Sequence, residues 1–164
     1  MAIAANLVIG VDGSTSFNGK SAKLSSDEDR RRFHEIRKGA DVIIIGGNTA
    51  RVEPYADTPI PLVVISRSKS IHEISNNSKA EILNMDPKAA LKESVAKYGE
   101  NVLIEGGPNL LMELLPLIEE LNITITDRSG DGQIMSFDGL TRDFIMESMD
   151  KIQGEIFYKF KRQM

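Results

Sequence analysis

Two pairs of neighbouring glycines directly follow apolar runs in this 164-residue chain. Gly46-Gly47 comes after residues 42–45, and Gly106-Gly107 comes after residues 102–104 and Glu105. Glycine lets the backbone approach a ligand closely, and a helix that begins at such a turn presents unpaired N–H groups to an anion. Each turn alone also fits an ordinary tight connection, but the pair favours a site for the phosphates of a long anionic cofactor.

A third cluster, Ser66-Arg67-Ser68, ends another apolar run. Hydroxyl groups beside a guanidinium suit the ribose 2′-phosphate of NADPH and favour that cofactor over NADH. A solvated turn is the alternative interpretation of these residues. Neither glycine pair matches the G-x-G-x-x-G fingerprint, so the sequence does not indicate an ordinary Rossmann dehydrogenase.

Glu105 stands between an apolar run and the second glycine pair, so we expect its carboxylate to face the cofactor cleft. There it would stabilise positive charge that develops at a carbon receiving hydride, or orient a substrate hydroxyl. A strand-end acid paired with a neighbour is the alternative. The two histidines, His34 and His72, have no second histidine at ligand spacing, and we predict no metal site.

Two segments resemble other ligand-binding motifs. Residues 13–21 resemble a phosphate-binding P-loop, but five residues separate the glycines where that motif has four. Residues 127–138 place Asp127, Asp131 and Asp138 at positions typical of an EF-hand calcium loop. A strand-like segment precedes this loop where an EF-hand needs a helix, which favours a solvated loop. A calcium-responsive binding module built on this loop is the non-enzymatic alternative.

The elements that must position these residues alternate between short apolar strands and helices. A helix is predicted from a cap at Ser25, with Glu28 bonding back to it, and ends before Gly39. Another begins at Asp86-Pro87 and ends at Tyr98, and a third passes through residues 111–114. This alternation predicts an α/β fold with a mostly parallel central sheet, and an antiparallel strand at its C-terminal edge. The predicted strands are residues 3–9, 41–45, 61–65, 80–83, 101–104, 122–126 and 155–160.

Length and composition fit a single domain over residues 1–164 that buries a core of its own. No apolar run approaches the roughly 18 residues of a membrane-spanning helix, and no basic signal segment opens the chain. The net charge of −4 gives no reason to expect nucleic acid, and the absence of cysteine excludes disulfides and thiolate zinc sites. We expect a cytoplasmic protein that binds small molecules, without a nucleic-acid or membrane partner.

Six short segments then occur in an order typical of one enzyme family: residues 6–13, 23–26, 37–41, 46–49, 53–54 and 105–109. Over residues 3–126 the chain resembles the reductase domain of riboflavin biosynthesis, which stands alone or forms the C-terminal half of a deaminase-reductase. The resemblance implies a dihydrofolate reductase-like three-layer fold. It also implies that NADPH reduces the ribosyl side chain of 5-amino-6-(5-phosphoribosylamino)uracil, or of its 2,5-diaminopyrimidine analogue, to the ribityl form.

The resemblance also implies roles for individual residues. Ser21, Arg37 and Glu105 would meet the substrate, with Glu105 nearest the reacting carbon. Lys23 stands where the family often has an aromatic residue beside the nicotinamide. The expected NADPH contacts include the glycine pairs and Ser66-Arg67 named above. In full they are Gly46, Gly47, Thr49, Glu53, Ser66, Arg67, Gly106, Gly107, Pro108, Asn109 and Leu110.

The chain departs from the family mainly in the substrate half. Ser14 stands where a lysine is usual, and residues 55–61 lack the family's usual arginine, for which Lys20, Lys23 or Arg51 would have to substitute. A phosphate-bearing substrate requires such a cation. Residues 127–138 also differ from the family's apolar, glycine-rich segment.

One enzymatic alternative, one alternative without turnover and an expected assembly accompany the resemblance. A dihydrofolate or dihydropterin reductase of this fold would carry a buried carboxylate on the first long helix. We expect none of that helix's acids, Asp27, Glu28, Asp29 and Glu35, to lie clearly on an apolar face. A reductase-like fold that kept its cofactor site and lost turnover is a further alternative. Because reductases of this family are often dimers, we expect a homodimer, with the apolar C-terminal strand as a plausible contact.

Overall fold

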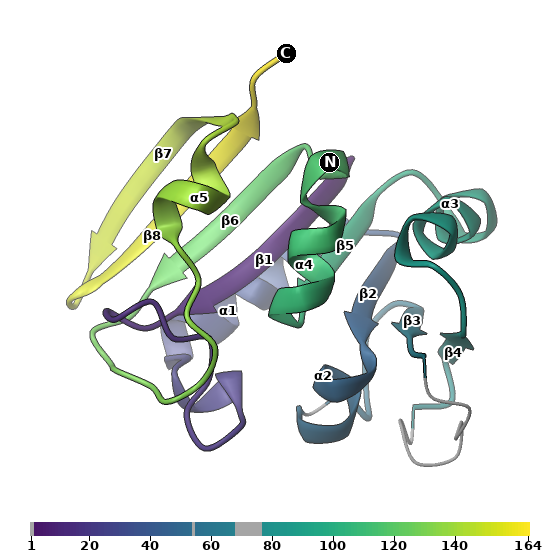
Figure 1. The fold of residues 1–164 in the computed structure, drawn as a ribbon, viewed down its shortest axis with the longest axis horizontal. Coiled ribbons are helices and arrows are strands. Elements are labelled where there is room, and N and C mark those ends of the chain that lie inside the picture. Colours follow the sequence, from purple (N-terminus) through teal and green to yellow (C-terminus); the bar gives the residue numbers. More distant parts are fainter. Residues whose placement is uncertain (1, 54, 68–76) are drawn as a thin grey trace.

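A single mixed sheet organises the computed structural model, which describes residues 2–53, 55–67 and 77–164. Within these residues the sheet has eight strands in the order β4-β3-β2-β5-β1-β6-β8-β7 (Figure 1). Neighbours from β4 to β6 run parallel, whereas β8 runs antiparallel to both β6 and β7. The strands are β1 Ile3–Ile9, β2 Val42–Gly46, β3 Leu62–Ile65, β4 Ala80–Leu83, β5 Val102–Gly106, β6 Glu120–Ile125, β7 Phe144–Ile152 and β8 Glu155–Arg162.

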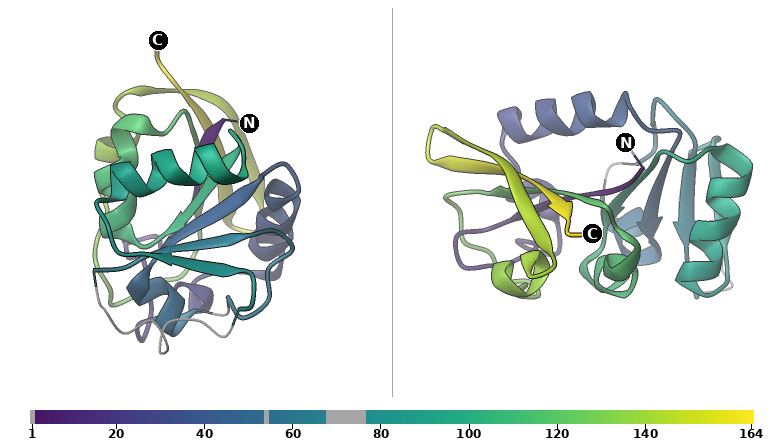
Figure 2. Two further views of the ribbon diagram at one scale, coloured as in Figure 1. Left: turned by 90° about the vertical axis from the view of Figure 1, so that its right-hand side faces the viewer. Right: turned by 90° about the horizontal axis from the view of Figure 1, so that it is seen from above.

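Helices cover both faces of the sheet and produce three layers (Figure 2). On one face α3 (Pro87–Tyr98), α4 (Pro108–Leu114) and α5 (Phe137–Thr141) pack on the main apolar cluster, which includes alternate residues of the central strands. On the other face α1 (Asp27–Arg37) packs through Ile36 against Ala4 and Leu103. The short α2 (Gly47–Val52) follows β2, and single 3-10 turns occur at Ser21–Lys23 (η1) and Leu115–Leu117 (η3).

The central strands form where they do because their residues are apolar on both faces. Every residue from Val42 to Ile45 and from Leu62 to Ile65 is buried, as parallel strands between two helical layers require. The parallel arrangement brings the carboxyl ends of β1, β2, β3 and β5 to one edge of the sheet. Each glycine pair spans the end of its strand, β2 or β5, and Ser66 directly follows β3.

The predicted α/β architecture with a mostly parallel sheet is confirmed, and so is the antiparallel C-terminal edge. That edge has a second strand, β7, which the sequence does not reveal because only Phe144 of its nine residues is buried. The helix cap predicted at Ser25 is wrong by one residue: Ser26 accepts a hydrogen bond from the backbone N–H of Asp29 at 3.0 Å. Ser25 instead donates its hydroxyl to the Asp29 carboxylate. Among the described residues, no helix is long and apolar enough to span a membrane.

Candidate functional site

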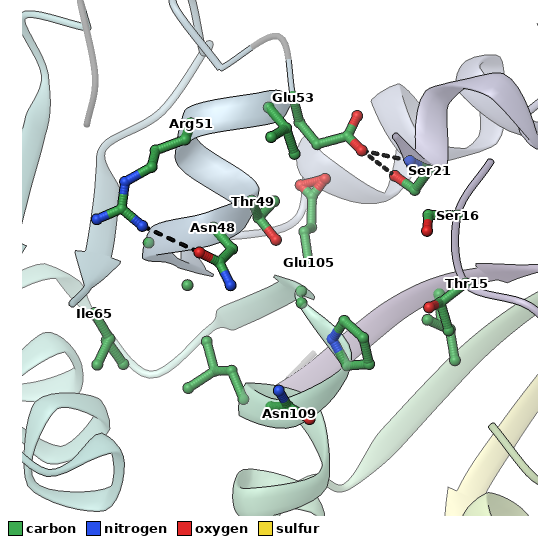
Figure 3. A pocket seen from close by; sticks show the side chains of 18 of the residues that line it. Thr15, Ser16, Ser21, Asn48, Thr49, Arg51, Glu53, Ile65, Glu105 and Asn109 are labelled. Carbon is green, nitrogen blue, oxygen red and sulfur yellow. Dashed lines mark hydrogen bonds between the residues drawn. The ribbon is translucent and has the colours of Figure 1, made fainter. Parts of the chain in front are cut away.

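A cavity of about 580 Å³ opens at the carboxyl ends of β1, β2, β3 and β5 (Figure 3). It receives side chains or backbone from almost every segment that the sequence singles out. Of the sequence-predicted site residues, those that line it are Ser21, Gly46, Gly47, Thr49, Glu53, Ser66, Arg67, Glu105, Gly106, Gly107, Pro108, Asn109 and Leu110.

The two glycine pairs touch each other and form one wall of this cavity. A β-carbon added to Gly46 would lie 3.6 Å from the backbone nitrogen of Gly107, and one added to Gly107 would lie 3.1 Å from Oγ1 of Thr49. Gly106 has a φ of +123°, in the region that favours glycine, and its peptide bond to Gly107 is cis. The wall is therefore backbone, with Thr49 between the two corners, and a flat or extended ligand can approach it closely.

Two arginines flank the Ser66 end of the cavity. A β-carbon on Gly47 would lie 3.0 Å from Oγ of Ser66 and 3.6 Å from Nη1 of Arg51. Arg51 donates to the Asn48 side chain at 3.1 Å, and the Arg67 guanidinium lies 3.6 Å from the Glu113 carboxylate with most of its side chain exposed. Ser68 lies outside the described residues. Within the described chain these are the only lysines or arginines that line the cavity, so its positive charge gathers at this end.

Glu105 sits at the cavity floor in a buried ion pair. The Arg37 guanidinium donates Nε to Oε2 at 2.8 Å and Nη2 to Oε1 at 2.8 Å, and the Tyr55 hydroxyl lies 3.5 Å from Oε1. The Glu105 side chain has no exposed surface, and that of Arg37 is 13% exposed. Arg37, predicted to contact substrate, therefore lies behind Glu105 and does not line the cavity.

Burial dominates the electrostatics of this pair. It raises the pKa of Glu105 above its ordinary value, although the hydrogen bonds and charge of Arg37 oppose the shift. Burial also raises the pKa of Tyr55 well above its ordinary value, so the phenol stays protonated. Arg37 remains charged: burial opposes its charge, but Glu105 outweighs that effect and raises the Arg37 pKa. The cavity floor thus carries a fixed, nearly neutral pair with a phenol beside it.

Ser21 and Glu53 connect the two sides of the cavity mouth. The backbone N–H and the hydroxyl of Ser21 both donate to Oε1 of Glu53, at 2.5 and 2.9 Å (Figure 3). Ser21 was predicted to meet the substrate and Glu53 the cofactor. Their contact therefore places the two expected subsites next to each other.

Lys23 is not brought to the cavity. It ends the η1 turn with its side chain exposed, and its ammonium group lies 5.9 Å above the ring of Phe17. His34 is exposed on α1, and His72 lies outside the described residues. Lys20 is exposed and does not line the cavity either, which leaves Arg51 as the one residue of the three proposed substitutes that does.

The segment that resembles a P-loop and the segment that resembles a calcium loop are hydrogen-bonded to each other. The Thr15 backbone N–H donates to the Gln133 carbonyl at 3.0 Å, and the Asp131 N–H donates to the Ser16 carbonyl at 3.1 Å. Gly130 and Gly132 are required by this approach, because β-carbons there would fall 2.1 Å from the Ser16 carbonyl oxygen and 1.9 Å from its hydroxyl oxygen. These two glycines of the calcium-loop-like segment therefore serve the packing of the two loops.

The surroundings of the second loop also lack the features of a calcium site. No group of three or more acidic, histidine or cysteine side chains that could hold a metal gathers anywhere in the described ranges. Strand β6 precedes the loop, where an EF-hand has a helix. Residues 13–21 likewise lead into the η1 turn and not into a helix that begins at the lysine.

Sequence reasoning did not name several of the cavity residues as site residues. Asn6 of β1 and Phe33 of α1 line the cavity, as do Thr15, Ser16 and Gln133 of the paired loops. An asparagine inside an apolar strand was the available signal for Asn6.

The expectation that no acid of α1 lies on its apolar face is wrong for Asp29, which is fully buried. Asp29 occupies the third position of α1, where its side chain turns under the helix and meets the Ser25 hydroxyl. Burial raises its pKa, and hydrogen bonds from Ser25 and Thr124 partly oppose this. Asp29 does not line the cavity.

Several solved structures share this fold. A putative riboflavin biosynthesis protein from Shewanella sp. PV-4 matches with a TM-score of 0.78 and 16% identity over 100% of both chains. A deaminase/5-amino-6-(5-phosphoribosylamino)uracil reductase from Thermotoga maritima matches with a TM-score of 0.75 and 14% identity over 99% of this chain, which spans only 56% of that protein. Dihydrofolate reductase from Enterococcus faecalis, complexed with NADP(H) and RAB-propyl, matches with a TM-score of 0.76 and 14% identity over 99% of this chain and 97% of that one. The predicted dihydrofolate reductase-like fold is confirmed.

Sequence comparison gives the narrower assignment. No curated protein matches the chain. The model of the RibD C-terminal domain, however, matches residues 2–126, which include β1 to β6 and nearly all of the cavity lining. The chain belongs to the family of RibD C-terminal domains.

Proposed function

We propose that this protein is an NADPH-dependent reductase that converts the ribosyl side chain of 5-amino-6-(5-phosphoribosylamino)uracil, or of its 2,5-diaminopyrimidine analogue, to the ribityl form. The observation that carries the proposal is the glycine-walled cavity at the parallel strand ends of a RibD C-terminal domain. Ligands of open α/β sheets bind at this edge. The similar deaminase/reductase from Thermotoga maritima supports the same reaction class, and the similar protein from Shewanella supports a place in riboflavin biosynthesis.

The residues present fit a dinucleotide with a 2′-phosphate. The backbone wall at Gly46 and Gly107 leaves room for the pyrophosphate, because no side chain projects from it. Ser66, Arg51 and Arg67 lie together at one end, where hydroxyl and guanidinium groups suit a phosphate monoester. A fold relative complexed with NADP(H) supports the assignment.

When bound, NADPH supplies the hydride, and the protein's residues orient the two ligands and shape the local charge. In this proposal Glu105 acts through its charge, from just beneath the cavity surface, on the carbon that receives hydride. Arg37 fixes the position of the carboxylate and sets how much of its charge the substrate experiences.

The substrate phosphate has no cation of its own at the Ser21 end of the cavity, within the part of the chain that is described. Both lining arginines lie at the Ser66 end, which we assign to NADPH. We therefore propose that the hydroxyl group of Ser16 and the side-chain amide of Gln133 meet the substrate phosphate. Neutral donors bind phosphate more weakly than guanidinium does, so the dephosphorylated substrate should be a comparably good one.

A dihydropterin or dihydrofolate reductase is the second candidate, and Asp29 is the observation that favours it. The Asp29 carboxylate is fully buried on the first long helix, and burial raises its pKa, so it is able to hold a proton. The pyrimidine reductase is preferred because Asp29 does not reach the cavity surface.

Turnover assays with a small substrate panel separate these candidates. NADPH oxidation is followed with the ribosylaminopyrimidine phosphate in its uracil and diamino forms, with dihydrofolate and with a dihydropterin. Oxidation with only the first two supports the main proposal, and oxidation with only the last two replaces it with the second candidate. NADPH binding without turnover of any of the four identifies a fold that kept its cofactor site and lost activity.

We also propose that the protein is a homodimer. Strand β8 is enclosed between β6 and β7, so at this end of the sheet the edge strand is β7 and not the last strand, while β4 forms the opposite edge. This edge exposes Ile145, Met146, Met149 and Ile152, with at least 36% of each accessible. An exposed apolar edge strand readily pairs with another strand, and two copies of β7 satisfy each other. Sedimentation analysis of wild type and Met149→Lys tests this, with a shift to monomer expected in the variant.

A further inference from the structure

Tyr55 is fixed at the cavity floor by both its backbone and its ring. Its N–H donates to the Glu53 carbonyl at 2.9 Å, and its carbonyl accepts from the side-chain amide of Asn77 at 3.1 Å. Tyr55 is 8% exposed, and its ring packs in an apolar cluster with residues of β2 and β3: Ile43, Ile45, Leu62 and Val64. A ring packed in this way keeps one orientation.

The hydroxyl is the one polar group of this buried side chain, and it reaches the ion pair of the cavity floor. It lies 3.5 Å from Oε1 of Glu105, and the guanidinium carbon of Arg37 lies 5.5 Å from the centre of the Tyr55 ring. In the described part of the chain, Arg37 and Tyr55 are the two residues that donate hydrogen bonds to the Glu105 side chain. Tyr55 therefore lies against both members of the pair.

Apolar packing does not explain why this residue carries a hydroxyl. A phenylalanine would fill the same cluster, whereas the phenol oxygen lies among charged groups. Burial and the charges of Glu105 and Glu53 raise the pKa of Tyr55 well above its ordinary value, although Arg37 opposes them. The phenol therefore stays protonated and remains a hydrogen-bond donor to Glu105 at any pH used for an assay.

Donation from Tyr55 opposes the effect of burial on Glu105. Burial raises the pKa of Glu105, whereas hydrogen bonds from Arg37 and Tyr55 and the charges of Arg37 and His34 lower it. Arg37 and His34 act from α1, and Tyr55 acts from the segment after α2. Unlike the two cations, Tyr55 stabilises the ionised carboxylate without adding positive charge to the cavity floor.

Resting on the proposed function, we propose that Tyr55 is a positioning residue for the reduction: its hydroxyl fixes Oε1 of Glu105 against Arg37, so that the carboxylate keeps the orientation and charge on which hydride transfer depends. In this role Tyr55 acts on the reaction only through Glu105. Loss of the hydroxyl should therefore weaken catalysis less than loss of Glu105 does, and only while Glu105 is present.

Titration of Glu105 in the protein without ligands tests the contact itself. Glutamate residues are labelled with ¹³C at the carboxyl carbon, and the Glu105 resonance is identified by its absence from Glu105→Gln. Tyr55→Phe should raise the pKa of Glu105 by about 0.4–1 pH unit, because a hydrogen bond to the ionised form is lost. Tyr98→Phe is the matched control, since the Tyr98 hydroxyl bonds the Glu81 carboxylate and neither residue lines the main cavity. It should leave the pKa of Glu105 unchanged.

Turnover of the ribosylaminopyrimidine phosphate tests the positioning role. Tyr55→Phe should lower kcat about 3-fold to 10-fold at pH 7, with the KM for substrate and the Kd for NADPH within about twofold of wild type. The acidic limb of its kcat profile should move to higher pH by the shift that the titration measures. In a Glu105→Gln background the same substitution should change kcat less than about 1.5-fold, because the two residues act as a unit.

The proposal is overturned if Tyr55→Phe leaves the pKa of Glu105 within about 0.2 unit of wild type, or if it lowers kcat equally with and without Glu105. A loss in both backgrounds would mark Tyr55 as part of the packing alone. The expected shift in the Glu105 pKa, without oxidation of NADPH by any ribosyl substrate, would instead refute the reductase function and leave the contact between Tyr55 and Glu105 standing.

Discussion

Replacing Arg37 with methionine tests the ion pair on which the cavity floor is built. The substitution keeps a long side chain but leaves the Glu105 carboxylate, which has no exposed surface, without its bidentate partner. Removal of one partner from a buried pair costs about 3–5 kcal/mol, because the remaining charge is buried alone. For a chain of this length each kcal/mol lowers the melting temperature by about 2–4 °C, so Arg37→Met should melt about 6–20 °C lower.

The loss should depend on pH in a defined direction. The folded-state pKa of Glu105 is already raised by burial, so the folded state binds more protons than the unfolded state above the ordinary glutamate pKa of 4.5. Stability from this group is therefore complete below that value and falls as the pH rises through the folded-state pKa. Without Arg37 the folded-state pKa rises further. The stability of the variant should thus decline over a wider pH range, by at most about 1.4 kcal/mol per pH unit for one proton.

Urea unfolding from pH 4.5 to 8 measures this effect, and two variants control for it. Arg37→Met with Glu105→Gln should lose less than the sum of the single losses and should lack the added pH dependence. Lys38→Met, which removes the exposed pair with Glu35, should change little. The reasoning is refuted if Arg37→Met melts within about 2 °C of wild type with an unchanged pH profile.

Three further predictions concern the charge, the loops and cations. Glu105→Gln should lower turnover about 10-fold or more while the Kd for NADPH stays within about twofold, since the coenzyme contacts lie elsewhere; unchanged turnover would remove Glu105 from the reaction. Gly132→Ala should lower the melting temperature, because its β-carbon would overlap the Ser16 hydroxyl. In the control Gly19→Ala the new β-carbon meets no atom within 4 Å, so the positive φ of that residue is the only source of destabilisation. Equal losses of melting temperature in the two variants would refute the loop packing. Calcium and EDTA should leave the melting curve unchanged, and a shift with either would restore the calcium-loop interpretation.

The sequence revealed the parts of the fold in which local preference and burial agree. The β-branched run at Val42 reads as a buried strand because it is buried on both faces, and Asp86 caps its helix as expected, accepting from two backbone N–H groups. Strand β7 was missed because its exposed residues follow no core pattern, and pairing with β8 creates it. Such an element depends on a tertiary partner that no local window contains.

The candidate site divides in the same way. The glycine corners and Glu105 were predictable, since they lie at or just after the carboxyl ends of β2 and β5, and parallel strands end at one edge of the sheet. The burial of Arg37 behind Glu105 was not predictable, because the two residues are 68 positions apart and only the packing of α1 on the sheet joins them. Lys23 was wrongly predicted to contact substrate, because the η1 turn directs its side chain outward. The burial of Asp29 was not predicted, because most residues of α1 are charged and exposed and nothing in their pattern marks the one buried position.

The central claim is that the touching glycine corners hold the reduced coenzyme, and Gly46→Ala tests it most directly. A β-carbon there has no neighbour closer than 3.6 Å and the φ of Gly46 is −85°, so the variant should fold normally while its methyl group fills the corner. Gly139→Ala, in α5 and away from the cavity, is the control. Calorimetric titration should show that wild type and Gly139→Ala bind NADPH about 10-fold or more tightly than NADH, and that Gly46→Ala loses about 10-fold or more in NADPH affinity. Absence of NADPH binding to wild type, or equal affinity in Gly46→Ala, would contradict the account.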